Sequence, residues 1–126
     1  GVETLLASLR REDHCLGLLT GNIERGAMVK VSHHGIADYF QFGAYGDDHW
    51  NRNKLGPIAL GRAEKSTGIK FSENEILVIG DTPKDVACAH AFGVKCVAVA
   101  TGQFNEEELV ASGADTTISN LKAFSL

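Results

Sequence analysis

The chain has 126 residues and a formal net charge of −4, and it is 44% hydrophobic and 22% charged. This length suffices for one domain with one hydrophobic core, and the composition is typical of a globular protein. No basic block indicates nucleic acid as a partner, and the longest apolar runs are far too short to span a membrane. The three cysteines lack metal-ligand spacing, which favours a reducing, cytoplasmic compartment.

The hydrophobic pattern predicts helices and strands in alternation. Apolar positions three to four apart predict helices over residues 2–12, 23–33, 55–67, 83–92 and 105–112. Short apolar runs predict strands over residues 16–19, 39–45, 76–79, 95–100 and 116–119, with a last helical turn over 120–124. The alternation predicts an α/β fold in which a Rossmann-like parallel sheet is covered by helices on both faces.

Several details of these elements are also predicted. Glycines suited to a left-handed helix end follow three of the helices, at Gly35, Gly68 and Gly93. In the helix over residues 23–33, we expect Ile23, Ala27 and Val31 to face inward.

The segment from Ile76 to Asp85 carries the strongest sign of a functional site. Its apolar run ends at Gly80, and the Thr82-Pro83 pair that follows is typical of a helix start. Asp81 is therefore expected at the carboxyl end of a buried strand, which is where ligands bind in open α/β sheets. Asp85 follows one helical turn later. Two carboxylates at such an edge are suited to Mg²⁺ and a phosphorylated substrate.

Two further segments carry groups that bind anions. The loop Thr20-Gly21-Asn22 ends a strand and opens a helix, so a hydroxyl, a close backbone approach and helix-start amides can all meet a phosphate there. Arg52 and Lys54 precede the helix over 55–67, and either cation could hold a phosphate. Taken alone, the first segment is also typical of a capped turn and the second of a solvated basic turn.

Other polar residues are interpreted as structural. Asp47 and Asp48 follow a predicted strand and are interpreted mainly as a turn, although their loop could border the site. The histidines form no ligand pattern, so we expect no histidine metal ligand among His14, His33, His34, His49 and His90.

Taken in order, these segments resemble the haloacid dehalogenase-like hydrolases, particularly the phosphoglycolate phosphatase-like branch. The segments that carry the likeness are Leu18–Asn22, Arg52–Leu55 and Val78–Asp85. Residues 1–6 and 97–102 are also similar, so the resemblance spans nearly the whole chain. It implies the core fold of that family and the hydrolysis of small-molecule phosphate esters.

The resemblance assigns roles to the phosphate-binding residues. It implies that Thr20 binds the transferring phosphoryl group, helped by the backbone of Gly21 and Asn22. It also implies a cation that neutralises this group. The family usually has a Lys-Pro pair there, which this chain lacks, so Arg52 and Lys54 both remain candidates.

The resemblance also implies a Mg²⁺ site and exposes one large departure. Asp81 would bind the metal directly, and Asp85 would bind it or hold its waters. The family's nucleophile, the first Asp of an Asp-x-Asp motif on a central strand before the cap, has no counterpart here. We therefore expect residues 1–126 to be the C-terminal portion of a core domain, nearly inert alone. A missing N-terminal segment or a partner chain would complete its sheet.

Two functions from different classes remain open. The first is a Mg²⁺-dependent phosphatase of small phosphorylated metabolites, which acts through an aspartyl-phosphate whose Asp lies outside this chain. The alternative is a non-catalytic α/β module that binds an anion or a partner, a reading motivated by the absent nucleophile. A receiver-like domain fits less well, because the segment from Cys15 to Thr20 has no acidic cluster.

Overall fold

The computed structural model describes residues 1–124, and the chain divides into two compact units. One unit comprises residues 1–5 and the chain from Phe71 onward, and the other comprises Leu6–Lys70. Each unit has its own hydrophobic cluster. The described strands form two sheets, and each sheet buries apolar side chains within its own unit. That residues 1–126 belong to one core domain stays a prediction.

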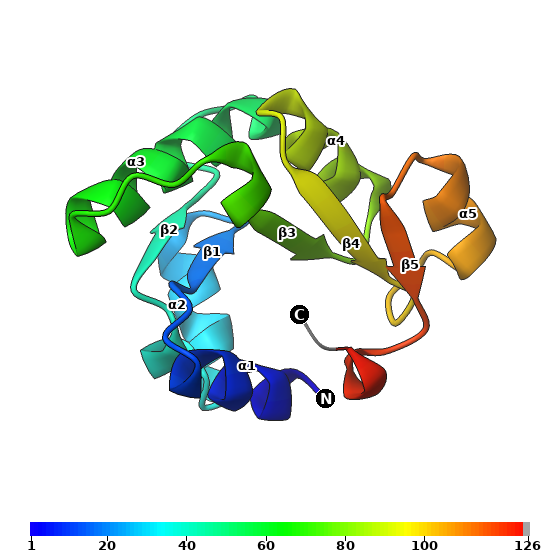
Figure 1. The fold of residues 1–126 in the computed structure, drawn as a ribbon, viewed down its shortest axis with the longest axis horizontal. Coiled ribbons are helices and arrows are strands. Elements are labelled where there is room, and N and C mark those ends of the chain that lie inside the picture. The colour runs from blue at the N-terminus through cyan, green and yellow to red at the C-terminus, as the bar shows by residue number, and fades with distance from the viewer. Residues whose placement is uncertain (125–126) are drawn as a thin grey trace. The chain divides into compact units, whose positions relative to one another are not determined.

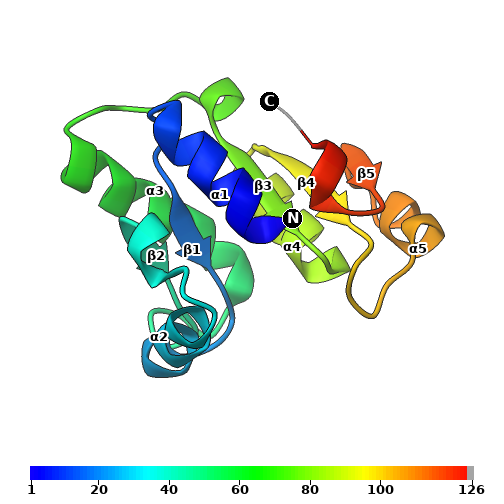
Figure 2. The same cartoon turned by 90° about the horizontal axis from the view of Figure 1, so that it is seen from below.

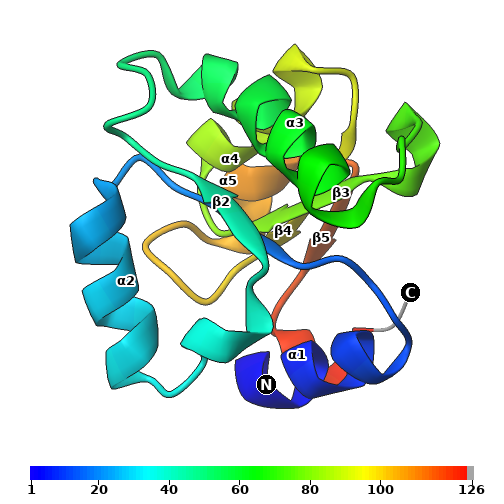
Figure 3. The same ribbon diagram turned by 90° about the vertical axis from the view of Figure 1, so that its left-hand side faces the viewer.

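The unit Leu6–Lys70 is a two-stranded parallel sheet with helices around it. The helix α1 (Val2–Arg11) leads into it, and its further elements are β1 (Gly17–Leu19), α2 (Glu24–His33), β2 (Phe42–Ala44) and α3 (Leu55–Thr67). Leu18 of β1 pairs with Gly43 of β2. Figure 3 shows α3 running beside β2, and the contact is made by Leu55 and Ala59 against Ala44.

The other unit is a three-stranded parallel sheet in the order β3-β4-β5 (Figures 1 and 2). Its elements are β3 (Leu77–Gly80), α4 (Pro83–Ala91), β4 (Lys95–Val99), α5 (Glu106–Ala111) and β5 (Thr116–Ile118). Cys96 and Ala98 of β4 pack with residues of α4 and α5 on one face of the strand. Val97 and Val99 point to the other face and are also buried, so β4 is covered on both sides, as predicted.

The predicted helices and strands are all present, with ends that differ by a residue or two except at one strand. The three helix-closing glycines adopt the expected left-handed conformation, with φ of +69° at Gly35, +73° at Gly68 and +80° at Gly93. The last predicted turn is a 3₁₀ turn over Leu121–Ala123. Within the described part of the chain, no helix is both long and apolar enough to cross a membrane.

Three local expectations were wrong. The strand predicted over residues 39–45 is shorter, because Ala37–Tyr39 forms a 3₁₀ turn in which the Tyr39 ring lies 4.2 Å beneath the Arg10 guanidinium. Ile23 is 58% exposed, because it is the extended N-cap before α2 and is not on the helix face. The strand before Asp81 is not fully buried, since Ile79 is 36% exposed.

In the part of the chain that the structure describes, the strand of each sheet that leads into the candidate site is an edge strand, with one side paired to no other strand. Among residues 1–124, β1 pairs only with β2, and β3 pairs only with β4. A strand with an unpaired edge exposes backbone donors and acceptors that can pair with another segment.

Candidate functional site

The loop after β1 places Thr20 at the carboxyl end of the two-stranded sheet. The Thr20 N–H donates to the Ala44 carbonyl at 3.1 Å, which carries the strand pairing one residue past β1. The Asn22 N–H donates to the Thr20 hydroxyl oxygen at 3.1 Å. Because the hydroxyl accepts this bond, its own proton can be donated to an anion. In this arrangement the backbone N–H of Asn22 is bonded to the Thr20 hydroxyl oxygen.

The same loop lies directly against the end of β2. The Gly46 N–H donates to the Asn22 carbonyl at 2.7 Å. A Cβ atom on Gly46 would overlap the carbonyl oxygen of Gly21, so only glycine permits this approach. The close approach of Gly46, two residues after the end of β2, therefore helps to set the position of the Thr20-Gly21-Asn22 loop.

Arg52 lies beside this loop. A Cβ built on Gly21 would lie 3.9 Å from an Nη atom of Arg52. Two short contacts shape the segment that carries Arg52, since Asn51 donates its N–H to His49 Nδ1 at 2.9 Å and accepts from the Asn53 N–H at 3.0 Å. Lys54 is the N-cap residue of α3 and is exposed.

In the other unit, the expected acidic motif forms a compact cap. Thr82 is the N-cap of α4 and Pro83 follows at its start, as predicted. One carboxylate oxygen of Asp85 accepts from the Asp81 N–H at 3.1 Å, the Thr82 N–H at 3.1 Å and the Thr82 hydroxyl at 3.0 Å. Asp85 is 8% exposed, whereas Asp81 is exposed. The two carboxylates therefore differ: Asp85 shapes the loop, and Asp81 faces outward.

Two glycines make room for these carboxylates, and the sequence analysis gave neither a role in the site. A Cβ on Gly80 would overlap the carboxylate of Asp85, and a Cβ on Gly102 would lie 2.6 Å from Asp81 Oδ2. Gly102 follows β4, the neighbour of β3. Two signals in the sequence pointed to it: its place just after a predicted strand, at the edge shared with Asp81, and the family likeness of residues 97–102.

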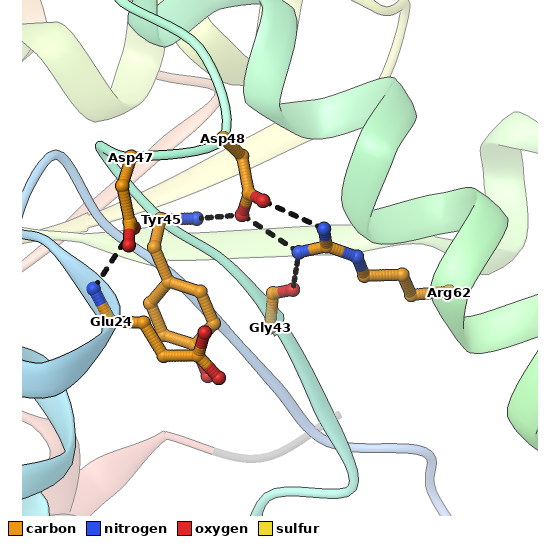
Figure 4. Close-up of polar contacts among 6 residues, drawn as sticks. All are labelled: Glu24, Gly43, Tyr45, Asp47, Asp48 and Arg62. Atoms are coloured by element: carbon orange, nitrogen blue, oxygen red, sulfur yellow. Dashed lines mark hydrogen bonds and ion pairs between the residues drawn. The ribbon is translucent and has the colours of Figure 1, made fainter.

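Asp48 and Arg62 form an ion pair that the sequence analysis did not predict (Figure 4). Two guanidinium nitrogens of Arg62 donate to the two carboxylate oxygens of Asp48, each at 2.7 Å, and one also donates to the Gly43 carbonyl at 2.7 Å. The Tyr45 N–H donates to Asp48 at 2.8 Å. The bonds from Arg62 and from Tyr45 lower the pKa of Asp48. The residues Gly46–Asp48 do form a turn, as predicted.

A hollow of about 380 Å³ lies elsewhere in the same unit. Glu24, Phe40, Tyr45 and Arg62 are among the residues that line it, and none of the predicted site residues does.

The acidic motif suits Mg²⁺ in its donor chemistry. Carboxylate oxygens are the ligands that this ion prefers, and proteins commonly bind it through one or two carboxylates together with waters and a substrate phosphate. The described residues contain no cluster of three or more His, Cys, Asp or Glu able to hold a metal. Asp81 is exposed and could serve as one such carboxylate ligand, and a Mg²⁺ site at this position stays a prediction.

The predicted site residues thus form two groups, one in each unit. The structure brings Arg52 to the loop of Thr20 and Gly21, and it brings Asp85 to Asp81. Each group lies at the carboxyl end of parallel strands. That the two groups share one site remains a prediction.

Comparison with known proteins places these features in a family. The model of the haloacid dehalogenase-like hydrolases matches residues 1–99. A phosphoglycolate phosphatase of Pseudomonas fluorescens Pf0-1 is 31% identical over 118 residues, which cover 94% of this chain and 42% of the relative. A phosphoglycolate phosphatase of Chromobacterium violaceum is 30% identical over 121 residues, which cover 96% of this chain and 52% of the relative. The chain spans about half the length of the curated relatives it matches.

Solved structures have the same fold. A HAD phosphatase from Thermococcus onnurineus matches with a TM-score of 0.71 and 24% identity, over 92% of this chain and 51% of that one. A β-phosphoglucomutase from Clostridium difficile matches with a TM-score of 0.79 and 18% identity, over 100% of this chain and 52% of that one. Since one fold hosts a phosphatase and a mutase, these likenesses support the architecture and not a particular reaction.

Proposed function

Since the chain belongs to the haloacid dehalogenase-like hydrolases, we propose that it is the C-terminal part of a Mg²⁺-dependent phosphatase of small phosphorylated metabolites. The observation that carries the proposal is the loop of Thr20 and Gly21, held beside the Arg52 guanidinium at the carboxyl end of β1. A hydroxyl donor and a cation at such an edge suit a phosphoryl group. The outward-facing Asp81 supplies a carboxylate at the corresponding end of β3.

In this proposal each residue has a distinct task. The Thr20 hydroxyl donates to a phosphoryl oxygen, and Arg52 offsets the charge that develops on the transferring group. The position of Arg52 beside Gly21 favours Arg52 over Lys54 for this role. Asp81 holds Mg²⁺, which when bound neutralises phosphoryl charge. Asp85 keeps Asp81 in place through the loop that it caps.

The nucleophile lies outside these residues in this proposal. In this proposal the ester P–O bond breaks as the phosphoryl group passes to an Asp carboxylate of a segment absent here, and the alcohol leaves after taking up a proton. Water then attacks the phosphorus atom, the bond to the Asp oxygen breaks, and inorganic phosphate and the free carboxylate are released. Among residues 1–124, β1 and β3 each have one edge that pairs with no other strand, which supports such a segment because each edge can accept one more strand. A preceding part of the same protein, or a partner chain, would supply both the strand and a cap.

The substrate class rests on the relatives alone. The curated relatives named above are phosphoglycolate phosphatases, which makes a small phosphorylated carboxylic acid the first substrate to test. We also propose a cytoplasmic location, because the three cysteines lack metal-ligand spacing and favour a reducing compartment.

Hydrolysis of a panel of phosphate monoesters by the full-length protein tests this function. We expect phosphate release with Mg²⁺ and none after chelation with EDTA, with phosphoglycolate among the best substrates. The non-catalytic alternative predicts anion or partner binding without turnover. Failure to hydrolyse any ester across a broad panel, by a folded full-length protein with Mg²⁺, would rule out the phosphatase.

A further inference from the structure

The start of α2 is capped from a distant part of the chain. Helix N-termini leave backbone N–H groups unpaired, and a Ser, Thr, Asp or Asn at the N-cap usually satisfies one of them. The N-cap of α2 is Ile23, which has no side chain able to do so. Instead, an oxygen of Asp47 accepts from the Glu24 N–H at 3.0 Å, across 23 positions of sequence.

Figure 4 shows that the adjacent carboxylates of Asp47 and Asp48 serve different partners. Asp48 binds Arg62 of α3 and the Tyr45 N–H. Asp47 binds Glu24, the first residue of α2. Of these two carboxylates, Asp47 is therefore the one seen to accept a hydrogen bond from the segment that continues from the Thr20-Gly21-Asn22 loop.

The Asp47 contact lies next to a second contact with the same loop. The Gly46 N–H donates to the Asn22 carbonyl at 2.7 Å, and Gly46 packs against Gly21. Two consecutive residues after β2 thus hold the loop and the helix start that follows it. A loop held at both points keeps one conformation before a ligand arrives, which lowers the entropic cost of binding.

We propose that Asp47 is a positioning residue for phosphoryl binding. Its carboxylate caps α2 from the end of β2 and so holds the loop from Thr20 to Asn22 in the conformation that receives a phosphoryl group. The inference rests on the proposed function of this loop. The negative charge of Asp47 lies near the anion site and would by itself weaken anion binding. The hydrogen-bond acceptor is therefore the useful property of Asp47, and its charge is not.

This distinction makes two substitutions diagnostic. Asp47→Asn keeps an oxygen acceptor and removes the charge, whereas Asp47→Ala removes both. Asp38→Asn removes one negative charge from an exposed position of the same unit and serves as the control. All three are compared with wild type in the full-length protein, by steady-state kinetics and by inhibition with inorganic phosphate. Hydrogen exchange of peptides over residues 20–28 is measured in parallel.

We expect Asp47→Ala to speed exchange over residues 20–28. It should also raise KM and the inhibition constant of inorganic phosphate by about five- to tenfold, the effect of losing a helix cap. Asp47→Asn should restore wild-type values or bind phosphate more tightly, and Asp38→Asn should change neither. Unchanged exchange and unchanged inhibition in Asp47→Ala would overturn the inference, as would equal weakening in Asp47→Ala and Asp47→Asn. A wild-type protein without turnover or phosphate binding would instead reject the proposed function, and the exchange data would still decide whether Asp47 caps α2.

Discussion

Gly102 lies against the carboxylate of Asp81, so closely that a Cβ atom on Gly102 would lie 2.6 Å from Asp81 Oδ2. The two residues follow neighbouring parallel strands, β4 and β3. The outward-facing carboxylate is thus supported from one side by backbone, and a side chain at position 102 would displace it.

Gly102→Ala should therefore weaken Mg²⁺ binding. Altering a group that orients a metal ligand typically costs about 10- to 100-fold in affinity, and we expect a loss in this range. Calorimetric titration of the full-length protein with Mg²⁺ measures it without any need for turnover. Gly61→Ala is the matched control, because Gly61 lies in α3 with open space around its added methyl group. That control should keep Mg²⁺ affinity and gain about 0.5–1 kcal/mol of stability. Equal Mg²⁺ affinity in Gly102→Ala and wild type would contradict the supporting role of Gly102.

Asp85→Ala should destabilise the protein through the loop that Asp85 caps. The change leaves the N–H groups of Asp81 and Thr82 without their shared acceptor, at a cost of about 1–3 kcal/mol. Asp85→Asn keeps an oxygen in place and should cost less. Chemical denaturation of the full-length protein gives both values. A stability loss in Asp85→Asn as large as that in Asp85→Ala would show that the charge, and not the cap, is what stabilises the loop.

Arg52→Ala should lower kcat far more than Lys54→Ala does. Arg52 lies beside Gly21, and removal of one group that stabilises transition-state charge costs about 10²–10³ in kcat. Lys54 is exposed at the N-cap of α3, and its loss should change kcat by less than about threefold, as expected for a solvated surface charge. Steady-state kinetics on one substrate ranks the two variants. The reverse ranking would transfer the role to Lys54.

Asp48 should make the stability of the protein depend on pH in the acid range. The Arg62 and Tyr45 donors lower the pKa of Asp48 in the folded state, whereas an unfolded Asp titrates near pH 3.9. A lowered folded pKa contributes stability above the unfolded pKa, and this contribution is lost as the pH falls through the folded value. Asp48→Asn should therefore lower Tm at pH 7, by the equivalent of about 1 kcal/mol, and the difference from wild type should shrink below about pH 4. A difference in Tm that stays constant down to pH 3 would exclude this linkage.

Local sequence patterns predicted the elements well, because their signals lie within a few residues. Thr82 and Pro83 mark the start of α4 by their own chemistry, and Gly68 ends α3 because a left-handed residue costs glycine little. The placement of Thr20 and Asp81 after strands followed from the same local signals.

Contacts between distant segments could not be predicted in this way. Asp48 and Arg62 lie 14 positions apart, and only the packing of α3 beside β2 brings them together. Which of Arg52 and Lys54 lies beside Gly21 likewise depends on how the segment before α3 folds, and the sequence does not reveal this. Periodicity assigned Ile23 to a helix face, but Ile23 precedes the helix as its N-cap residue. The hydrogen bond that caps the helix comes from Asp47, which is distant in sequence.

The most direct test of the central claim is a crystal structure of the full-length protein with Mg²⁺ and a bound phosphate. The account predicts that a single phosphate contacts the Thr20 hydroxyl and Arg52, while the Mg²⁺ beside it is bound by the Asp81 carboxylate. A structure in which Thr20 and Asp81 lie at opposite ends of the molecule, or in which phosphate and Mg²⁺ bind elsewhere, would contradict it.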